Sequence, residues 1–253
     1  NMLKENGYTT AVVCAVETFF LNSKEGYMHL GLDKTVFKQQ FTVPRQFAHV
    51  DRGQNDAYTD YEVAQQVILT YEEMRKENKP VMIYANTFEN HYPFELKKFI
   101  ESGRVKVELT KIPKGLSKAE VSKLTAYIQG LYYADKCIAE LMNYFEKSGR
   151  NVIIVAYGDH LAGIGHKIDY YKKLGVMSEG KTGEYTYEQL LQAHTVPYYV
   201  WDNFTSTAPK LPQEPIAMCH LLPVVFRDYG IKLNENGKFL AYASTVLPDY
   251  GLQ

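Results

Sequence analysis

The chain has 253 residues, enough for a single large α/β domain. Its 28 Lys and Arg against 29 Asp and Glu give a net charge of −1, so it lacks the broad basic surface that binding to nucleic acid requires. Hydrophobic residues make up 45% of the chain and charged residues 23%, as in globular proteins, and no run reaches the roughly 18 apolar residues of a membrane span. We therefore expect residues 1–253 to form one soluble domain that does not bind nucleic acid.

Apolar periodicity and turn residues predict the elements in chain order. They are a helical turn at 2–6, a strand at 8–14, a long irregular stretch at 16–58, a helix at 59–78, a strand at 80–86, a helix at 117–148, a strand at 151–157, a helix at 187–193, a strand at 196–201, a helix at 214–229 and an edge strand at 238–242. Alternating helices and apolar strands are typical of an α/β fold with a largely parallel sheet and helices on both faces, because crossovers between parallel strands cover the sheet.

Two of the predicted helices begin at capping boxes. Thr59 is followed by Glu62 and Ser117 by Glu120, which is the spacing at which a hydroxyl and a carboxylate each bond the other residue's backbone N–H. These two helices are therefore predicted with well-defined starts.

Polar residues follow two of the predicted central strands, where ligands gather in an open α/β sheet. Asp159 and His160 come directly after the strand at 151–157, and a carboxylate beside an imidazole suits Zn²⁺ or Mn²⁺ better than Ca²⁺. The alternative is that Asp159 caps the next helix and His160 is a solvated surface residue. His166 and His194 are two further candidates to converge on a metal, and either residue could equally be solvated.

His91 lies in the loop after the strand at 80–86, just before Pro93. A histidine there could donate a proton to a leaving oxygen or hold a phosphate, and the alternative is that Asn90 and His91 only organise the turn. There is no phosphate-binding Gly-x-x-x-x-Gly-Lys loop, no dinucleotide-binding Gly-x-Gly-x-x-Gly and no Gly-x-Ser-x-Gly nucleophile elbow. Residue chemistry alone does not name a reaction.

The order of these motifs resembles the sulfatase-like domain of lipoteichoic acid synthases and related phosphoglycerol transferases, in the alkaline phosphatase superfamily. The matching segments are Gly7 to Thr10, Gly31 to Lys34, Asn90 to Phe94, Tyr127 to Lys136, Ile153 to His160 and His194 to Pro197. Of these, Tyr157-Gly158-Asp159-His160 is the most specific.

The resemblance implies a metal-dependent phosphotransferase or phosphodiester hydrolase that acts on a cell-envelope phospholipid or phospho-glycan. It implies one divalent cation, Mn²⁺ first with Zn²⁺ or Mg²⁺ as alternatives, held by Asp159 and His160, and a substrate contact at His91. Asn22 and His194 are weaker candidates for substrate binding. The resemblance also implies a membrane-anchored parent protein whose catalytic domain lies on the extracellular face of the bacterial cell membrane.

Two departures from the family pattern bear on function. The family's nucleophilic threonine and acidic metal ligand precede the segment matched by residues 8–14, so we expect them upstream of residue 1, and we expect the chain by itself to be inactive. Where lipoteichoic acid synthases have Phe-Trp-Asn-Arg, this chain has Phe20-Leu21-Asn22-Ser23, which lacks the arginine fork for phosphate. A sulfuric ester hydrolase and a non-catalytic binding module of the same fold are the alternative functions.

Overall fold

A computed structural model describes residues 2–45, 58–164, 167–177, 186–206 and 215–248. The chain forms two compact units. The first unit contains residues 1–7, 151–161 and 180–253, and the second contains residues 8–150 and 162–179. That the whole chain acts as one domain stays a prediction.

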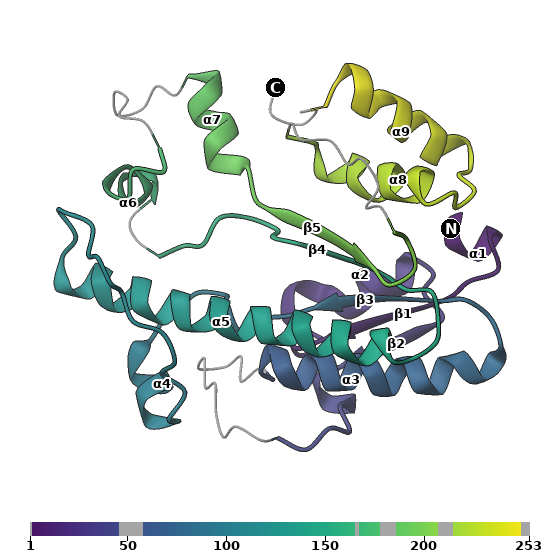
Figure 1. The fold of residues 1–253 in the computed structure, drawn as a ribbon, viewed down its shortest axis with the longest axis horizontal. Helices are drawn as coiled ribbons and strands as arrows, with labels where there is room; N and C mark the ends of the chain where they lie inside the picture. Colours follow the sequence, from purple (N-terminus) through teal and green to yellow (C-terminus); the bar gives the residue numbers. More distant parts are fainter. Residues whose placement is uncertain (1, 46–57, 165–166, 178–185, 207–214, 249–253) are drawn as a thin grey trace. The chain divides into compact units, whose positions relative to one another are not determined.

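The second unit is built on a parallel sheet (Figure 1). Its elements are β1 (Thr9–Cys14), η1 (Phe20–Asn22), α2 (Ser23–His29), β2 (Lys34–Phe37), η2 (Lys38–Gln40), α3 (Asp60–Met74), η3 (Arg75–Glu77), β3 (Val81–Asn86), α4 (Leu96–Glu101), α5 (Lys118–Glu146) and α6 (Lys167–Lys173). The strand order is β2-β1-β3, and Val13 of β1 pairs with Val36 of β2 and Ala85 of β3. This confirms the predicted α/β class with parallel strands joined by helical crossovers.

The central strand β1 is buried along its whole length, which requires cover on both faces of the sheet. On one face, Tyr27 of α2 contacts the rings of Phe37 and Tyr84. The helix α3 packs on β1 and β3, and its Val63 and Val67 belong to the same buried core. In turn α5 packs along α3, as Figure 1 shows.

Both predicted capping boxes are present. The backbone N–H of Thr59 donates to Glu62 at 2.8 Å, and the N–H of Glu62 donates to the Thr59 hydroxyl at 3.3 Å. Ser117 and Glu120 make the same pair of bonds at 2.8 and 3.2 Å. The two long helices of this unit therefore begin where the sequence predicts.

Gly130 lets the loop after β3 lie directly against α5. A Cβ atom at Gly130 would be 2.0 Å from the side-chain oxygen of Asn90, so no larger residue fits while Asn90 keeps its position. His91 is the next residue of this loop. The missing side chain on α5 therefore helps to set the path of the loop that carries His91.

The first unit contains an antiparallel strand pair and a helix pair. Its elements are α1 (Met2–Glu5), β4 (Ile153–Tyr157), α7 (Tyr187–His194), β5 (Tyr198–Asp202), α8 (Met218–Asp228) and α9 (Glu235–Val246). Val155 of β4 pairs with Val200 of β5, and α8 packs on α9. The two strands are antiparallel, since the chain reverses its direction between the end of β4 and the start of β5.

The edge strand predicted at 238–242 is wrong, because these residues lie in α9. The side chain of Asn234 accepts a hydrogen bond from the backbone N–H of Gly237 at 3.0 Å, which caps the helix. Ala241 and Ala243 are buried on this helix. The helix cap and the packing of small residues favour a helix in this segment, whereas the predicted strand rested only on a short apolar run.

Among the described residues, no helix combines the length and apolar character that crossing a membrane requires.

The contact at Gly130 gives a stability prediction. Alanine is favoured over glycine within a helix by about 1 kcal/mol, so Gly26→Ala on α2, where a Cβ atom meets nothing within 4 Å, should raise the free energy of unfolding. Gly130→Ala should instead lower it by about 1 kcal/mol or more, because Asn90 must move. Urea denaturation measures both. Equal stabilisation by the two variants would contradict the contact between Gly130 and Asn90. Adding Asn90→Ala to Gly130→Ala should restore part of the lost stability.

A second prediction concerns Asp202 at the end of β5. Its carboxylate accepts bonds from the Tyr229 hydroxyl at 2.6 Å and from Thr205 and Phe204. Burial acts to raise the pKa of Asp202, but these bonds outweigh burial and lower the pKa to about 2.

Because the folded pKa lies below the usual value of 3.8, the stabilisation from Asp202 is present above that value and is lost as the pH falls toward 2. Asp202→Asn should therefore destabilise the protein near pH 7, and the difference from the wild type should shrink below pH 4. Thermal unfolding across this range measures it, and a difference independent of pH would contradict the assignment.

Candidate functional site

Asp159 and His160 lie directly past the end of β4. Gly158 continues the strand pairing by donating its N–H to the carbonyl of Pro197 at 3.2 Å. A Cβ atom at Gly158 would be 3.3 Å from the Cβ atom of Val196, tighter than ordinary contact, so glycine suits this turn. The strand end thus delivers a carboxylate and an imidazole side by side, as predicted.

The ring of His160 is oriented by its own backbone. Its Nδ1 atom lies 2.9 Å from the carbonyl oxygen of Leu161, and because a carbonyl only accepts, Nδ1 must carry the hydrogen. The lone pair is then on Nε2, which lies 3.6 Å from a carboxylate oxygen of Asp159. The side chains of Asp159 and His160 are 82% and 62% exposed. Both metal-binding atoms therefore face outward together.

This donor set fits two ligands of a divalent cation. Carboxylate oxygen and neutral imidazole nitrogen are ligands for Mn²⁺ and Zn²⁺, and a second bond at Nδ1 is how metal-binding histidines are usually held. Within the described ranges, no group of three or more His, Cys, Asp or Glu side chains is placed to hold a metal ion. Since catalytic zinc sites usually draw on three protein ligands, the pair would supply only part of a complete set.

His194 is the last residue of α7. Its Nδ1 atom lies 2.8 Å from the carbonyl of Leu190, one helical turn earlier. Because Val196 and Pro197 lie against Gly158, the segment after His194 runs beside the start of the Asp159 turn. His194 therefore belongs to the same end of the strand pair as Asp159. His166 lies outside the described residues.

His91 follows β3 in the second unit and is held on three sides. Its Nδ1 atom lies 2.6 Å from the carbonyl of Tyr92, which again places the hydrogen on Nδ1 and the lone pair on Nε2. Its ring stacks on Phe88 with 4.4 Å between ring centres and meets the edge of Phe20 at 6.5 Å. The imidazole is thus oriented before any ligand binds.

Asn22 lies on the segment that supports His91. Phe20 touches the His91 ring, and the next two residues, Leu21 and Asn22, have left-handed backbones with φ of 48° and 54°. Asparagine tolerates this conformation, whereas leucine there costs of order 1 kcal/mol. Such strain is found at functional segments. The structure brings the Asn22 segment and the His91 loop together within this unit.

A buried ion pair that no sequence pattern predicts anchors the His91 loop. Arg104 and Glu89 approach to 2.5 Å with side chains 4% and 0% exposed. The other Glu89 oxygen accepts the backbone N–H of Asp60 at 3.0 Å, and the Asp60 carboxylate accepts the N–H of Glu89 at 3.2 Å. Glu89 precedes His91 by two residues, so the loop is fixed to the start of α3.

The guanidinium of Arg104 is held in turn by aromatic rings. It lies 3.9 Å from the ring centre of Tyr133 on α5 and 5.6 Å from that of Phe99 on α4. The Tyr133 hydroxyl donates to the Arg104 carbonyl at 3.0 Å. The one signal for Glu89 in the sequence is that an acidic residue lies among apolar residues in the loop predicted to carry His91. No sequence pattern near Arg104 identifies it as a partner.

The candidate residues thus form two groups, one on each compact unit. Asp159 and His160, with His194 at the same strand end, belong to the first unit, and His91 with Asn22 belongs to the second. That the two groups share one cavity stays a prediction.

Comparison with known proteins gives a family. The family model for sulfatases matches residues 1–227. A Rhizobium meliloti (strain 1021) protein named for cyclic beta-1,2-glucan modification is 28% identical over 206 residues, which is 81% of this chain and 29% of that protein. The chain therefore spans less than a third of that relative.

Two solved structures share the fold. The lipoteichoic acid synthase LtaP of Listeria monocytogenes has a TM-score of 0.63 at 20% identity, over 92% of this chain and 52% of that one. The phosphoglycerol transferase GacH of Streptococcus pyogenes, in complex with sn-glycerol-1-phosphate, has a TM-score of 0.66 at 16% identity, over 94% and 54%. These likenesses confirm the predicted fold, and the chain spans about half of each structure.

Removing one partner of the buried ion pair between Glu89 and Arg104 should cause a large loss of stability. Arg104→Ala leaves the Glu89 carboxylate buried without its cation and should lower the free energy of unfolding by about 3–5 kcal/mol. The double variant Glu89→Gln/Arg104→Met removes both charges of this pair and should be closer to the wild type. Lys97→Ala, which breaks an exposed pair with Glu101, is the control and should change stability by less than about 1 kcal/mol. If urea denaturation gives Arg104→Ala the same small effect as the control, the ion pair is not the anchor.

Proposed function

Because this chain belongs to the sulfatase family, we propose that it carries part of the active site of a metal-dependent phosphotransferase or phosphodiester hydrolase. Its substrate would be a phospho-substituted lipid or glycan of the bacterial cell envelope. The observation that carries the proposal is the Asp159 and His160 pair at the end of β4, with the Nε2 lone pair of His160 beside the Asp159 carboxylate. Such a pair is ready to bind a cation.

Asp159 and His160 would hold the divalent cation, with Mn²⁺ first and Zn²⁺ or Mg²⁺ as alternatives. When bound, a divalent cation lowers the pKa of a hydroxyl nucleophile and neutralises charge that develops on the phosphoryl oxygens. The contact of His160 Nδ1 with the Leu161 carbonyl would keep Nε2 as the coordinating atom. The resemblance to phosphoglycerol transferases implies a threonine nucleophile, which we propose lies outside these 253 residues.

His91 would serve the oxygen that attacks or leaves phosphorus. With its hydrogen on Nδ1 and bonded to the Tyr92 carbonyl, His91 presents a basic Nε2 that accepts the proton of an incoming hydroxyl. The protonated ring can return that proton to a departing oxygen. Stacking on Phe88 and the edge contact with Phe20 keep the imidazole in one orientation through both steps.

The proposed substrate class rests on the relatives and on one departure of this chain from the family's sequence motif. One relative is named for the modification of a cyclic glucan, and one structural neighbour is a phosphoglycerol transferase with glycerol phosphate bound. This chain has Ser23 where the synthase motif has arginine, so Asn22 and His91 would contact the substrate without a guanidinium at that position. We favour transfer of a phospho-substituent onto or from a glycan.

The same reasoning gives the proposed location. Envelope glycans and their lipid donors lie outside the cytoplasm, so the domain would act at the extracellular face of the cell membrane, within a membrane-anchored protein.

Activity measurements on the whole protein test this proposal. With Mn²⁺ present, it should cleave bis(p-nitrophenyl) phosphate but not p-nitrophenyl sulfate. His160→Ala should reduce the rate by roughly 100-fold or more, because it removes a metal ligand, and His91→Gln by about 100-fold through loss of proton transfer. The control is His29→Ala, because His29 is also exposed and its Nδ1 atom also contacts a backbone carbonyl, that of Glu25, at 2.7 Å.

Each outcome decides between the functions. Cleavage of the sulfate ester alone would overturn the proposal in favour of a sulfuric ester hydrolase. Cleavage of neither substrate would favour the non-catalytic binding module. A His29→Ala variant as inactive as His160→Ala would show that the losses come from misfolding.

A further inference from the structure

The loop that joins α4 to α5 is held against the helix by a buried amide. Gln129 is 0% exposed, and its side-chain oxygen accepts the backbone N–H groups of Lys106 and Val107 at 2.8 and 3.1 Å. The Gln129 amide nitrogen donates to the Val107 carbonyl at 2.7 Å. Further along the loop, two side chains pack against a buried hydrophobic cluster, those of Leu109 and Leu116. Residues 102–117 therefore have a packed inner side, and their outer side chains project from a backbone that is held in place.

The outer side of this loop carries unbalanced positive charge. Four exposed lysines lie on the loop or at the first residue of α5, namely Lys106, Lys111, Lys114 and Lys118. Among the described residues none of these four ammonium groups forms an ion pair, and the nearby acids pair with other lysines. Those pairs are Lys97 with Glu101, Lys98 with Glu95 and Lys173 with Glu120. One exposed carboxylate of the loop, that of Glu108, is therefore left against four lysines.

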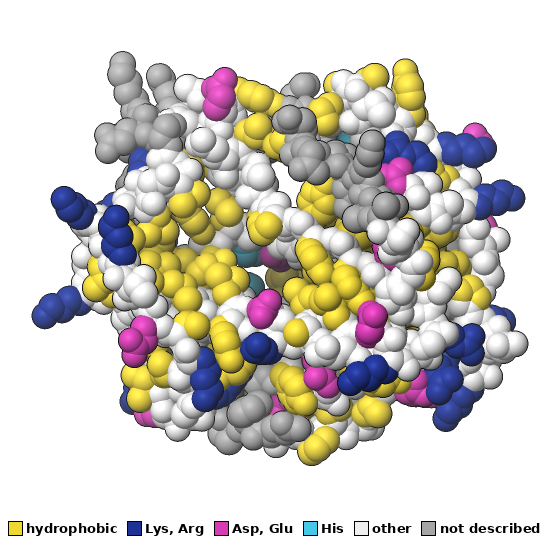
Figure 2. All heavy atoms as spheres, in the orientation of Figure 1, with side chains coloured by type: hydrophobic (Ala, Val, Ile, Leu, Met, Phe, Trp, Pro, Cys, Tyr) yellow, Lys and Arg dark blue, Asp and Glu magenta, His cyan; other side chains and the backbone are white. Residues whose placement is uncertain are grey.

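Aliphatic side chains lie among these lysines. Val105 precedes Lys106 and is 41% exposed. Ile112 follows Lys111 and is 57% exposed. In Figure 2, dark blue side chains stand out beside yellow ones at the left edge, over the amino-terminal end of α5. A lysine combines an apolar stem with a charged tip, so lysines beside aliphatic groups suit a boundary between apolar and charged surroundings. We call Val105, Ile112 and the four lysines the basic surface.

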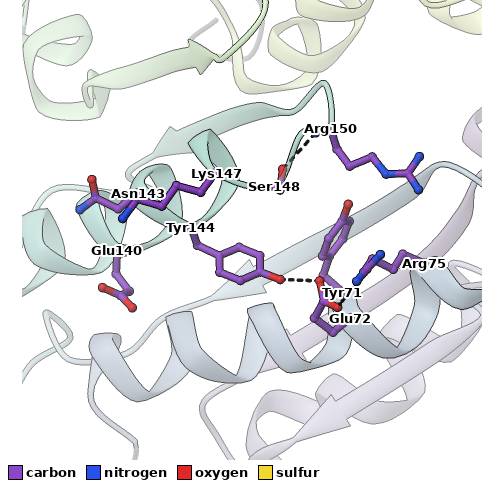
Figure 3. Close-up of a pocket in the computed structure, with 9 residues that line it drawn as sticks. All are labelled: Tyr71, Glu72, Arg75, Glu140, Asn143, Tyr144, Lys147, Ser148 and Arg150. Carbon is purple, nitrogen blue, oxygen red and sulfur yellow. Dashed lines mark hydrogen bonds and ion pairs between the residues drawn. The ribbon is translucent and has the colours of Figure 1, made fainter.

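The carboxyl-terminal end of α5 does not share this imbalance. A cleft of about 730 Å³ lies there against α3, and its lining includes two carboxylates, those of Glu72 and Glu140. In Figure 3 the Tyr144 hydroxyl reaches across to Glu72, which also pairs with Arg75 at 2.6 Å. The Lys147 side chain in the same view points away from Arg75. The cations at this end thus lie among carboxylates and point in different directions.

We propose that the basic surface binds an anionic lipid bilayer, with its lysines at the lipid phosphates and with Val105 and Ile112 at the boundary of the acyl chains. Lysines near an anionic bilayer and aliphatic groups that enter its interface both add to such binding. A soluble polyanion would use the lysines but would leave the aliphatic side chains in water. Because Gln129 holds the loop backbone in place, docking orders little of the chain. The proposal does not rest on the proposed function, because neither His91 nor Asp159 takes part.

Co-sedimentation of the full 253-residue chain with lipid vesicles tests this surface. With EDTA present, the chain should bind vesicles of mixed phosphatidylglycerol and phosphatidylcholine but not vesicles of phosphatidylcholine alone, and binding should fall with added salt. Lys111→Glu/Lys114→Glu should weaken binding by roughly tenfold or more, because each lysine near an anionic surface is worth about a factor of five. Val105→Ser/Ile112→Ser, which keeps every charge, should weaken binding by about fivefold or more, because less apolar surface enters the interface.

The matched control reverses two cations near the carboxyl-terminal ends of α3 and α5. Lys76→Glu/Lys147→Glu makes the same change in net charge at exposed positions and should leave binding within about twofold, because charges that far from the bilayer are screened. No binding to the phosphatidylglycerol vesicles, or an equal loss in the two charge-reversal variants, would overturn the proposal. Undiminished binding by the serine variant would also overturn it, since the surface would then suit any polyanion. The assay contains neither metal nor phosphodiester substrate, so its result is separate from that of the proposed function.

Discussion

The ion pair between Glu89 and Arg104 is the constraint on which the His91 loop depends. A carboxylate that is 0% exposed must be compensated by a charge or by hydrogen bonds, and Glu89 has both, from Arg104 and from the backbone of Asp60. These bonds join the loop after β3 to the start of α3, while Tyr133 holds the arginine against α5. Because removing any one partner exposes the others to an uncompensated buried charge, these segments form one mechanical unit. The position of His91 therefore depends on a charge pair whose carboxylate, Glu89, lies two residues earlier in the chain.

In the candidate histidines His91 and His160, the same kind of hydrogen bond determines which ring nitrogen carries the proton. In both, Nδ1 bonds the carbonyl of the next residue, Tyr92 for His91 and Leu161 for His160, so the shape of the turn sets the tautomer. His194 bonds the carbonyl four residues earlier in its helix, which has the same effect on the ring by a different route. A turn that follows a strand is thus sufficient to present Nε2 for a proton or a cation.

Local chemistry made most of the fold predictable, and long-range pairing did not. The capping boxes at Thr59 and Ser117 predict the starts of the two long helices, and apolar runs predict β1, β3, β4 and β5, because both signals act over a few neighbouring residues. The strand β2 was not predicted, since it lies in the stretch at 16–58 that was expected to be irregular. The tail was mispredicted because the cap at Asn234 and the packing of α9 on α8 outweigh a short apolar run. Of the candidate site, sequence located Asp159, His160 and His91, since each follows a strand. It could not find Arg104, whose partner lies in another loop and whose burial depends on rings from two helices.

The long helix α5 links features at both ends of the second unit. Gly130 and Tyr133 of this helix contact the loop and the ion pair beside His91, and Tyr144, about 20 Å along the helix from Gly130, bonds Glu72 of α3. A capped helix of 29 residues that packs along α3 behaves as a stiff rod, so the positions of its two ends are not independent. The Glu72 to Tyr144 bond near the carboxyl-terminal end of α5 and the Arg104 to Tyr133 contact near its middle both resist sliding of α5 over its neighbours. Two separate contacts therefore fix the position of α5 along its neighbours. The His91 loop packs against this helix, and the carboxyl-terminal end of the helix is held by a separate polar network.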